Sequence, residues 1–413
     1  RLEVFLEKAS PLEWLILQDF SQKIYWENRS KTEQFAGIGN ALELKNLKGK
    51  YKNILTDIQN LLDGSSESIR FFGGMRFDAK TSCSKEWAEW GESNFTIPIV
   101  ELSIVNNKVS LACHIDLQKN ILAKLNELKI ILEGIRVEDI TIPDNPLIRL
   151  DRNDLPEYKQ WCEIIKKGLE KISKGKLNKV VLARTAIFSL ARNYDPTEIL
   201  LQLRRQAPHA FHFCFQIAPN KAFLGITPEL LYRRSGREIE SEAIASTRPR
   251  GQTFEEDERL AIELLESEKE RREHLMVLDR MERLLKIFCS NTRRLSYLER
   301  FPLRHVQHLQ SKVSGRLKPK INDSDLLPAF HPTPAVSGTP DSEARKLIRQ
   351  IEPFDRGWYS GPVGWIGLNR AEFAVGIRSG LLCGRILRIY TGAGILKESL
   401  PEEEWREIED KLQ

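Results

Sequence analysis

Apolar residues recur at helical spacing along residues 254–290, and two carboxylates continue the apolar face. Glu270 and Glu273 are three residues apart, so on a helix they share a face. Steps of three and four residues from Glu273 lead to Val277, Met281, Leu284 or Leu285, and Phe288. Because acids are rarely buried without a partner, the pattern predicts a cation or a fixed donor in front of the pair. For this stretch alone, a solvated charged helix face is the more common outcome.

Further patterns along the chain predict a mixture of strands and helices. Alternating or short apolar runs predict strands at 23–29, 33–39, 70–77, 95–105, 108–117, 178–190, 211–218, 221–226, 229–235, 358–367, 371–383 and 385–396. Helical spacing or capping residues predict helices at 44–62, 117–132, 158–173, from Asp195 onward, at 254–290 and at 402–413. Strand-rich stretches interrupted by long helices favour an α+β fold over a doubly wound parallel sheet. Three prolines within 141–157 mark the best internal boundary.

Composition narrows the function classes. The chain has 413 residues, 41% hydrophobic and 29% charged, as in a soluble globular protein. Its six cysteines are far apart, without a CxxC motif or a Cys/His cluster, which favours reduced thiols and a cytoplasmic protein over a zinc site or disulfides. No apolar run approaches the ~20 residues of a membrane span. The net charge of +5 is spread among acids, which disfavours nucleic acid and is compatible with a small anionic substrate.

Several separated segments carry unusual chemistry. Near the end of the chain, Glu404 and Glu407 repeat the three-residue spacing, and Lys411 follows Glu407 by one helical turn. Lys179 opens an otherwise apolar strand, and an acid, Glu229, follows a proline between two apolar strands. Small residues in IASTRPRG (244–251), HPTPAVSGTP (331–340) and TGAGIL (391–396) suit close backbone contact with a ligand.

Together these segments resemble the chorismate-utilising enzymes and, within that family, the isochorismate synthases. The resemblance covers roughly residues 155–412 and is spread over seven motifs in the family's order: NKVVLAR, TPELL, SEAIASTRPRG, SEKERREH, HPTPAVSG, EPFDRGWYSGPVGW and TGAGI with EEEWREIEDKL. It implies a large single domain of two stacked, mainly antiparallel β-sheets surrounded by helices. In that reading, residues 151–413 form the chorismate-binding catalytic core, and residues 1–150 add strands and helices to the same fold.

The resemblance also implies a Mg²⁺ ion held by glutamates of two helices. Glu273 and Glu407 match its ligands, and Glu270 and Glu404 match acids that support it through water. Mg²⁺ prefers few carboxylates together with waters and substrate oxygens, so such a site has room for a substrate carboxylate.

The reaction implied adds water at C2 of chorismate and expels the 4-hydroxyl group, which gives isochorismate. It needs a general base and a general acid on opposite sides of the ring. Lys179 matches the base, and burial would lower its pKa as that role requires. Glu229 matches the acid, which a hydrophobic pocket would keep protonated. Taken alone, each would more often be a surface residue at a strand end.

Further residues match the substrate pocket of the family. Arg378 and Tyr359 match residues that bind a substrate carboxylate, with the Gly392 amide and Lys411 completing that pocket. Thr247 matches a contact to the ring, through its hydroxyl or its backbone.

Three histidines and one serine leave questions open. His331 matches a loop histidine near the ring and could equally be structural, whereas His274 and His308 are expected to pack beside the site. Ser246 stands where the family commonly has glycine, and a positive φ there would strain a serine.

Relatives with other activities differ at defined positions. Anthranilate synthases typically have Gln where Lys179 stands, and aminodeoxychorismate synthases have Lys where Ala245 stands, so an amination reaction and an amidotransferase subunit are not expected. Salicylate synthases share the lysine and the glutamate but also eliminate pyruvate, and they remain the alternative. A catalytically dead paralogue would lack a key residue such as Glu273 or Glu407, and none is missing. The product could enter menaquinone or siderophore biosynthesis.

Overall fold

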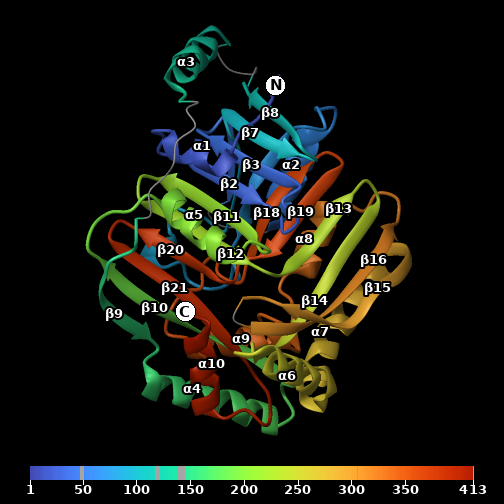
Figure 1. Cartoon of the computed structure of the whole chain (residues 1–413). Coiled ribbons are helices and arrows are strands. Elements are labelled where there is room, and N and C mark those ends of the chain that lie inside the picture. Colours follow the sequence, from blue (N-terminus) through green and yellow to red (C-terminus); the bar gives the residue numbers. More distant parts are fainter. Residues whose placement is uncertain (47–50, 117–120, 137–144, 305, 413) are drawn as a thin grey trace.

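Two antiparallel sheets form the centre of the molecule (Figure 1). The computed structural model describes residues 1–46, 51–116, 121–136, 145–304 and 306–412. Within these residues the larger sheet has twelve strands and the smaller has nine. This confirms the predicted α+β fold of two mainly antiparallel sheets with helices around them.

The order of the strands across each sheet mixes early and late parts of the chain. The larger sheet contains, in order, β1 (Leu2–Leu6), β8 (Lys108–Cys113), β7 (Val100–Val105), β3 (Glu33–Ile38), β2 (Lys23–Glu27), β11 (Phe211–Ala218), β12 (Lys221–Thr227), β20 (Ser379–Cys383), β21 (Ile386–Ile395), β10 (Lys179–Leu190) and β17 (Gly338–Thr339), with β9 (Arg149–Leu155) also paired to β10. The smaller sheet contains β15 (Cys289–Pro302), β16 (Val306–Leu317), β14 (Glu238–Pro249), β13 (Leu230–Ser235), β19 (Arg370–Val375), β18 (Pro362–Gly367), β5 (Arg70–Met75), β6 (Ser93–Ile97) and β4 (Leu42–Asn46). Strands that precede residue 114 therefore extend both sheets.

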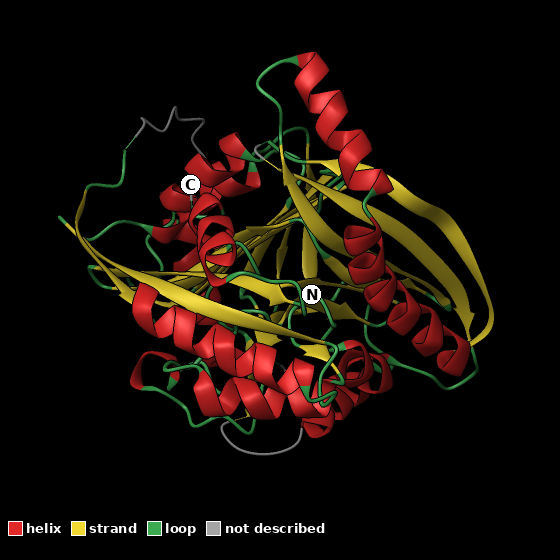
Figure 2. Ribbon diagram, turned by 90° about the horizontal axis from the view of Figure 1, so that it is seen from below, coloured by secondary structure: helices red, strands yellow, loops and turns green. Residues whose placement is uncertain are grey.

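Helices cover the sheets and connect them (Figure 2). They are α1 (Pro11–Leu17), α2 (Tyr51–Leu62), α3 (Ile121–Gly134), α4 (Tyr158–Ser173), α5 (Pro196–Gln206), α6 (Phe254–Glu266), α7 (Glu268–Phe288), α8 (Asp323–Phe330), α9 (Asp341–Ile351) and α10 (Pro401–Asp410), with a 3₁₀ turn at Lys85–Trp87. Helix α7 packs on β14 and β16 of the smaller sheet, and α10 packs on α4 and β21 of the larger sheet. No helix in the described ranges is long and apolar enough to cross a membrane.

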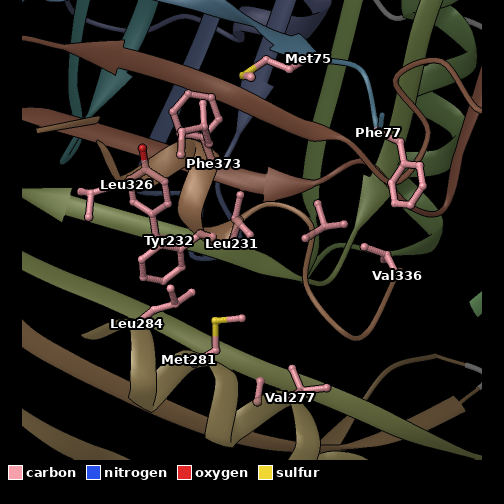
Figure 3. Packing of buried hydrophobic residues seen from close by; sticks show 14 of the residues in the cluster. Met75, Phe77, Leu231, Tyr232, Val277, Met281, Leu284, Leu326, Val336 and Phe373 are labelled. Atoms are coloured by element: carbon pink, nitrogen blue, oxygen red, sulfur yellow. The ribbon is translucent and has the colours of Figure 1, made fainter. Parts of the chain in front are cut away.

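The apolar stripe of α7 is buried as its spacing predicts. Val277 and Met281 are fully buried, and Figure 3 shows both side chains below Leu231 and Tyr232 of β13. The same cluster continues into α8 through Leu326. The burial of this stripe fixes the rotation of α7, and with it the direction of the acids in its first turns.

Two predicted helices have different bounds. The stretch 254–290 is two helices, because Ser267 has an extended backbone, ends α6 and accepts a hydrogen bond from the Glu270 N–H through its hydroxyl. In the stretch 44–62 the helix begins only at Tyr51, because Leu42–Asn46 pairs with β6 as a strand. The first residues of the predicted helix 117–132 and of the boundary segment 141–157, and the last residue of the predicted helix 402–413, lie outside the described residues.

Two predicted single strands are divided between the sheets. The segment 95–105 contributes to β6 of the smaller sheet and then, after Pro98 and Ile99, forms β7 of the larger sheet. The segment 371–383 contributes to β19 of the smaller sheet and then forms β20 of the larger sheet. The apolar alternation continues where each segment passes from one sheet to the other, so the sequence pattern does not mark these two positions.

Candidate active site

A cavity of about 160 Å³ collects the predicted site residues from both sheets and from two helices. Strands β10 and β21 supply its larger-sheet side, β14 and β16 supply its smaller-sheet side, and α7 and α10 supply the acids. Eleven of the twelve predicted residues line it: Lys179, Glu229, Thr247, Glu270, Glu273, Tyr359, Arg378, Gly392, Glu404, Glu407 and Lys411.

Lys179 is the first residue of β10, and its side chain is 2% exposed. Its Nζ donates a hydrogen bond to Oε1 of Glu273 at 2.7 Å. Gly394 lies beside this pair, and a Cβ there would come within 2.8 Å of Lys179 Cε and 3.1 Å of Glu273 Oε1. The absence of a side chain at Gly394 therefore provides the space for the pair.

Glu229 lies in the short segment that crosses from β12 to β13, and it is 3% exposed. Burial raises its pKa to about 8, and the negative charge of Glu242 acts in the same direction. The Thr333 hydroxyl, which donates to Oε1 of Glu229 at 3.3 Å, and the charge of Lys179 act against this rise. Glu229 therefore holds a proton near neutral pH, as a general acid must.

Four carboxylates of α7 and α10 line the same cavity. Burial, with the neighbouring Glu273, raises the pKa of Glu270. Burial also raises the pKa of Glu404 to about 7, with Glu407 adding to the effect, and Oε2 of Glu404 has no hydrogen-bond partner in the described part of the chain. Burial acts against ionisation of Glu407 too, but the Lys411 ammonium lowers its pKa overall. Lysines pair with Glu273 and Glu407, whereas Glu404 is left with an oxygen that has no partner in the described residues.

The fit of this cluster to Mg²⁺ can be judged from its donors. In the described ranges, no three His, Cys, Asp or Glu side chains are gathered closely enough to hold an ion, and Glu273 and Glu407 each face a lysine. The donor type nevertheless suits Mg²⁺, which binds carboxylate oxygens and retains waters. The unpartnered oxygen of Glu404 and the mutual repulsion of the acids are the features that a cation would relieve. Magnesium binding stays a prediction.

Hydrogen-bond donors line the cavity beside Glu407. Nη1 of Arg378 donates to the Lys411 carbonyl at 3.2 Å, and Nζ of Lys411 donates to the Gly392 carbonyl at 3.0 Å. Burial raises the pKa of Tyr359 to about 12, so its hydroxyl remains a donor, and its ring stacks on Tyr390 at 5.1 Å. Two cations and a phenol in one buried region suit a substrate carboxylate.

A bulge at Ser246 within β14 contacts both β16 and α7. Ser246 has a φ of 64°, so the strain expected for a serine there is present. Its hydroxyl donates to the Glu270 carbonyl at 2.7 Å. His308 Nδ1 lies 3.0 Å from the Ser246 carbonyl and 3.2 Å from Thr247 Oγ1, and burial lowers its pKa to about 3. Since a carbonyl only accepts, the neutral His308 carries its proton on Nδ1.

The family of the chain follows from comparison with known proteins. The family described as "Chorismate binding enzyme" matches residues 3–413. This chain belongs to that family. Isochorismate synthase 2, chloroplastic, of Arabidopsis thaliana is 34% identical over 414 residues, which cover 96% of this chain and 72% of that protein. Anthranilate synthase component 1 of Saccharolobus solfataricus is 40% identical over 254 residues, which cover 60% of this chain and 59% of that protein.

Among solved structures, that of MenF, the menaquinone-specific isochorismate synthase from Escherichia coli, superposes on this chorismate-binding enzyme with a TM-score of 0.89. The identity is 27%, and the match covers 100% of this chain and 92% of the other. These relatives confirm the resemblance to isochorismate synthases and the expectation of an enzyme.

The structure does not bring His331 to the cavity of this chorismate-binding enzyme. Its Nε2 lies 2.9 Å from the Phe77 carbonyl, and its ring meets the Phe77 ring edge-on at 6.0 Å between centroids. Burial lowers its pKa to about 4, so the ring is neutral and donates to that carbonyl. Of the two roles considered for His331, the structural one fits these contacts.

His308, which the sequence analysis expects beside the site, lines the cavity. Three other residues of the site were not recognised in the sequence: Lys269 lines the cavity, and Glu242 and Thr333 act on Glu229. Glu242 and Thr333 lie inside the SEAIASTRPRG and HPTPAVSG motifs, so the motifs were the available signal. Only the fold shows which residue within each motif faces Glu229.

Proposed function

We propose that this chorismate-binding enzyme converts chorismate reversibly to isochorismate. Water adds at C2 of the ring and the 4-hydroxyl group leaves, so atoms and charge balance without an oxidant or a second substrate. The observation that carries the proposal is the pairing of a buried lysine with a buried, protonated glutamate in one cavity. The first can take a proton from water and the second can give one to the leaving oxygen.

Lys179 acts as the general base and must lose its own proton first. In the structure Nζ of Lys179 donates to Oε1 of Glu273 at 2.7 Å. Bound Mg²⁺, held by Glu273 and Glu407 with support from Glu270 and Glu404, would supply positive charge to these acids and to a substrate carboxylate.

Substrate recognition follows from the donors that line the cavity beside Glu407. Arg378, Tyr359 and Lys411 present a guanidinium, a phenol and an ammonium, and Thr247 lies at the end of β14 beside His308. These donors hold one carboxylate of chorismate and fix the ring between Lys179 and Glu229.

Amination of chorismate is disfavoured by the same residues. Lys179 stands where anthranilate synthases typically have Gln, although one such enzyme is among the relatives. For the pathway, we propose menaquinone biosynthesis ahead of siderophore biosynthesis, supported by the similarity to the menaquinone-specific enzyme along the whole chain. Cytoplasmic location and the absence of an amidotransferase subunit are parts of the same proposal.

The test is incubation of the protein with chorismate and Mg²⁺, followed by chromatography of the products. Isochorismate without salicylate or pyruvate is expected, and chelation of the metal is expected to stop turnover. Salicylate as the main product would favour the salicylate synthase reading, and no turnover by folded protein would exclude both.

Variants of two lysines separate catalysis from folding. Lys179→Ala is expected to abolish turnover and leave chorismate binding largely intact, measured by calorimetry. Lys176→Ala, at an exposed position three residues earlier, is the matched control and keeps full activity. A Lys179→Ala protein that unfolds would indicate a structural lysine instead.

A further inference from the structure

The backbone on both sides of Glu229 is held by side chains from elsewhere in the fold. The Pro228 carbonyl accepts a hydrogen bond from Nη1 of Arg29 at 2.9 Å. The Leu230 N–H donates to Oε1 of Glu242 at 2.7 Å. The residues immediately before and after Glu229 are therefore both fixed.

The two side chains that hold this segment also hold each other. Nη2 of Arg29 donates to Oε2 of Glu242 at 2.7 Å, and the Gln310 amide donates to the same oxygen at 2.8 Å. The Arg29 guanidinium lies over the rings of Phe211 and Phe301, at 5.1 and 5.5 Å from their centroids. Ring contacts on the guanidinium and three hydrogen bonds to one carboxylate leave both side chains little freedom.

We propose that Arg29 and Glu242 form a clamp that positions Glu229 and keeps it in its proton-bearing form for transfer to the leaving oxygen. Neither residue lines the cavity, so both are positioning residues and not catalytic ones. The clamp rests on the proposed function, because it presumes that Glu229 is the general acid. It also connects residue 29, in the first part of the chain, to residues 228–242 in the second part.

The charges around Glu229 show how the clamp would act. Glu242 faces it from β14, Lys179 from β10, and the Thr333 hydroxyl from the segment between α8 and β17. Of these, only Glu242 favours the protonated form of Glu229. Removing the charge of Glu242 while keeping an oxygen acceptor should therefore make Glu229 a stronger acid that loses its proton at lower pH.

The experiment compares Glu242→Gln with Asp323→Asn. Asp323 is the buried carboxylate of another arginine pair, with Arg234 on β13, and it does not line the cavity. Both variants remove the charge of a buried carboxylate that is paired with an arginine. For Glu242→Gln, the alkaline limb of the pH profile of kcat/KM is expected to move to lower pH by about one unit. At pH values above that limb, kcat/KM should therefore be roughly tenfold lower than in the wild type. For Asp323→Asn, stability falls and the limb stays in place.

A second variant tests positioning by itself. Arg29→Lys keeps the positive charge beside Glu242 but cannot reach both the Pro228 carbonyl and the carboxylate with a guanidinium fork. We expect kcat to fall several-fold and KM for chorismate to remain unchanged. A fall in thermal stability with unchanged kcat would overturn the positioning role.

An activity-independent readout distinguishes failure of the clamp from failure of the proposed function. Infrared difference spectroscopy follows the carbonyl stretch of protonated Glu229 as pH rises. The spectrum of the Glu229→Gln variant is the reference that identifies this band. In Glu242→Gln the band is expected to disappear at lower pH than in the wild type. An unchanged titration would overturn the clamp even if isochorismate is formed, whereas a shifted titration in a protein inactive on chorismate would keep the clamp and refute the function.

Discussion

The strained serine at the bulge of β14 allows a prediction in which backbone strain and a hydrogen bond act in opposite directions on stability. Ser246 has a φ of 64° at a position where the family commonly has glycine, and it is 5% exposed. The left-handed region costs a non-glycine residue about 1–2 kcal/mol. The hydroxyl offsets part of this by donating to the Glu270 carbonyl at 2.7 Å, a bond that contributes about 1 kcal/mol.

Two substitutions separate these terms. Ser246→Ala keeps the strain and loses the hydrogen bond, so the free energy of unfolding should fall by about 1 kcal/mol. Ser246→Gly loses the same bond but relieves the strain, so its stability should lie within about 1 kcal/mol of the wild type and above that of the alanine variant.

Urea unfolding of the three proteins, followed by circular dichroism, measures this order. The slopes of the transitions should be equal, so that the midpoints report stability alone. An alanine variant as stable as the wild type, and more stable than the glycine variant, would refute the reasoning. Both variants remove the Ser246 bond between β14 and the first turn of α7, so the Mg²⁺ requirement that is part of the proposed function should rise in both.

Three further outcomes follow from the geometry. Gly394→Ala should fold but lose most of its activity with chorismate, because its Cβ would lie 2.8 Å from Lys179 Cε. Burial raises the pKa of Glu229 from 4.5 to about 8, so the free energy of unfolding should fall as pH rises across that interval. In Glu229→Gln, denaturant unfolding at several pH values should show that this dependence is lost. His331→Ala should lower the free energy of unfolding by about 2 kcal/mol in urea titrations, since it loses its bond to the Phe77 carbonyl and its ring contact.

The helical acids could be predicted because their signal is local. Glu270 and Glu273 continue the stripe of Val277 and Met281, and the packing of that stripe decides where the acids point. The break at Ser267 was not visible, because a serine at such a position is compatible with a helix until its hydroxyl caps the next one. Periodicity thus gives the face of a helix more reliably than its ends.

The hairpin of β15 and β16, in contrast, has no clear local signal in the sequence. Most residues of β15 are exposed or half-buried, since the strand lies at the edge of the smaller sheet and pairs only with β16. An edge strand with both faces in solvent needs no apolar alternation, so its sequence carries little strand signal. Its existence follows from pairing with β16, which is a non-local property.

Glu229 and Arg378 owe their positions to another non-local property, the exchange of strands between the sheets. The chain leaves the larger sheet after Thr227 and enters the smaller one at Leu230, and it makes the reverse crossing between Val375 and Ser379. The two crossings are bonded to each other, because the Val375 N–H donates to the Glu229 carbonyl and the Ile226 N–H donates to the Arg378 carbonyl, both at 3.0 Å.

The family resemblance identified these two residues, although the strand pattern did not mark them. At a crossing the backbone leaves one ladder before it joins the next, so its side chains can face the space between the sheets instead of the core of either one. Arg378 adopts a φ of 49° there, a conformation that alternation in the sequence does not reveal. The proposed acid and the proposed carboxylate-binding arginine are thus held by one pair of mutually bonded crossings. A change in the length of either crossing should therefore disturb proton transfer and substrate binding together.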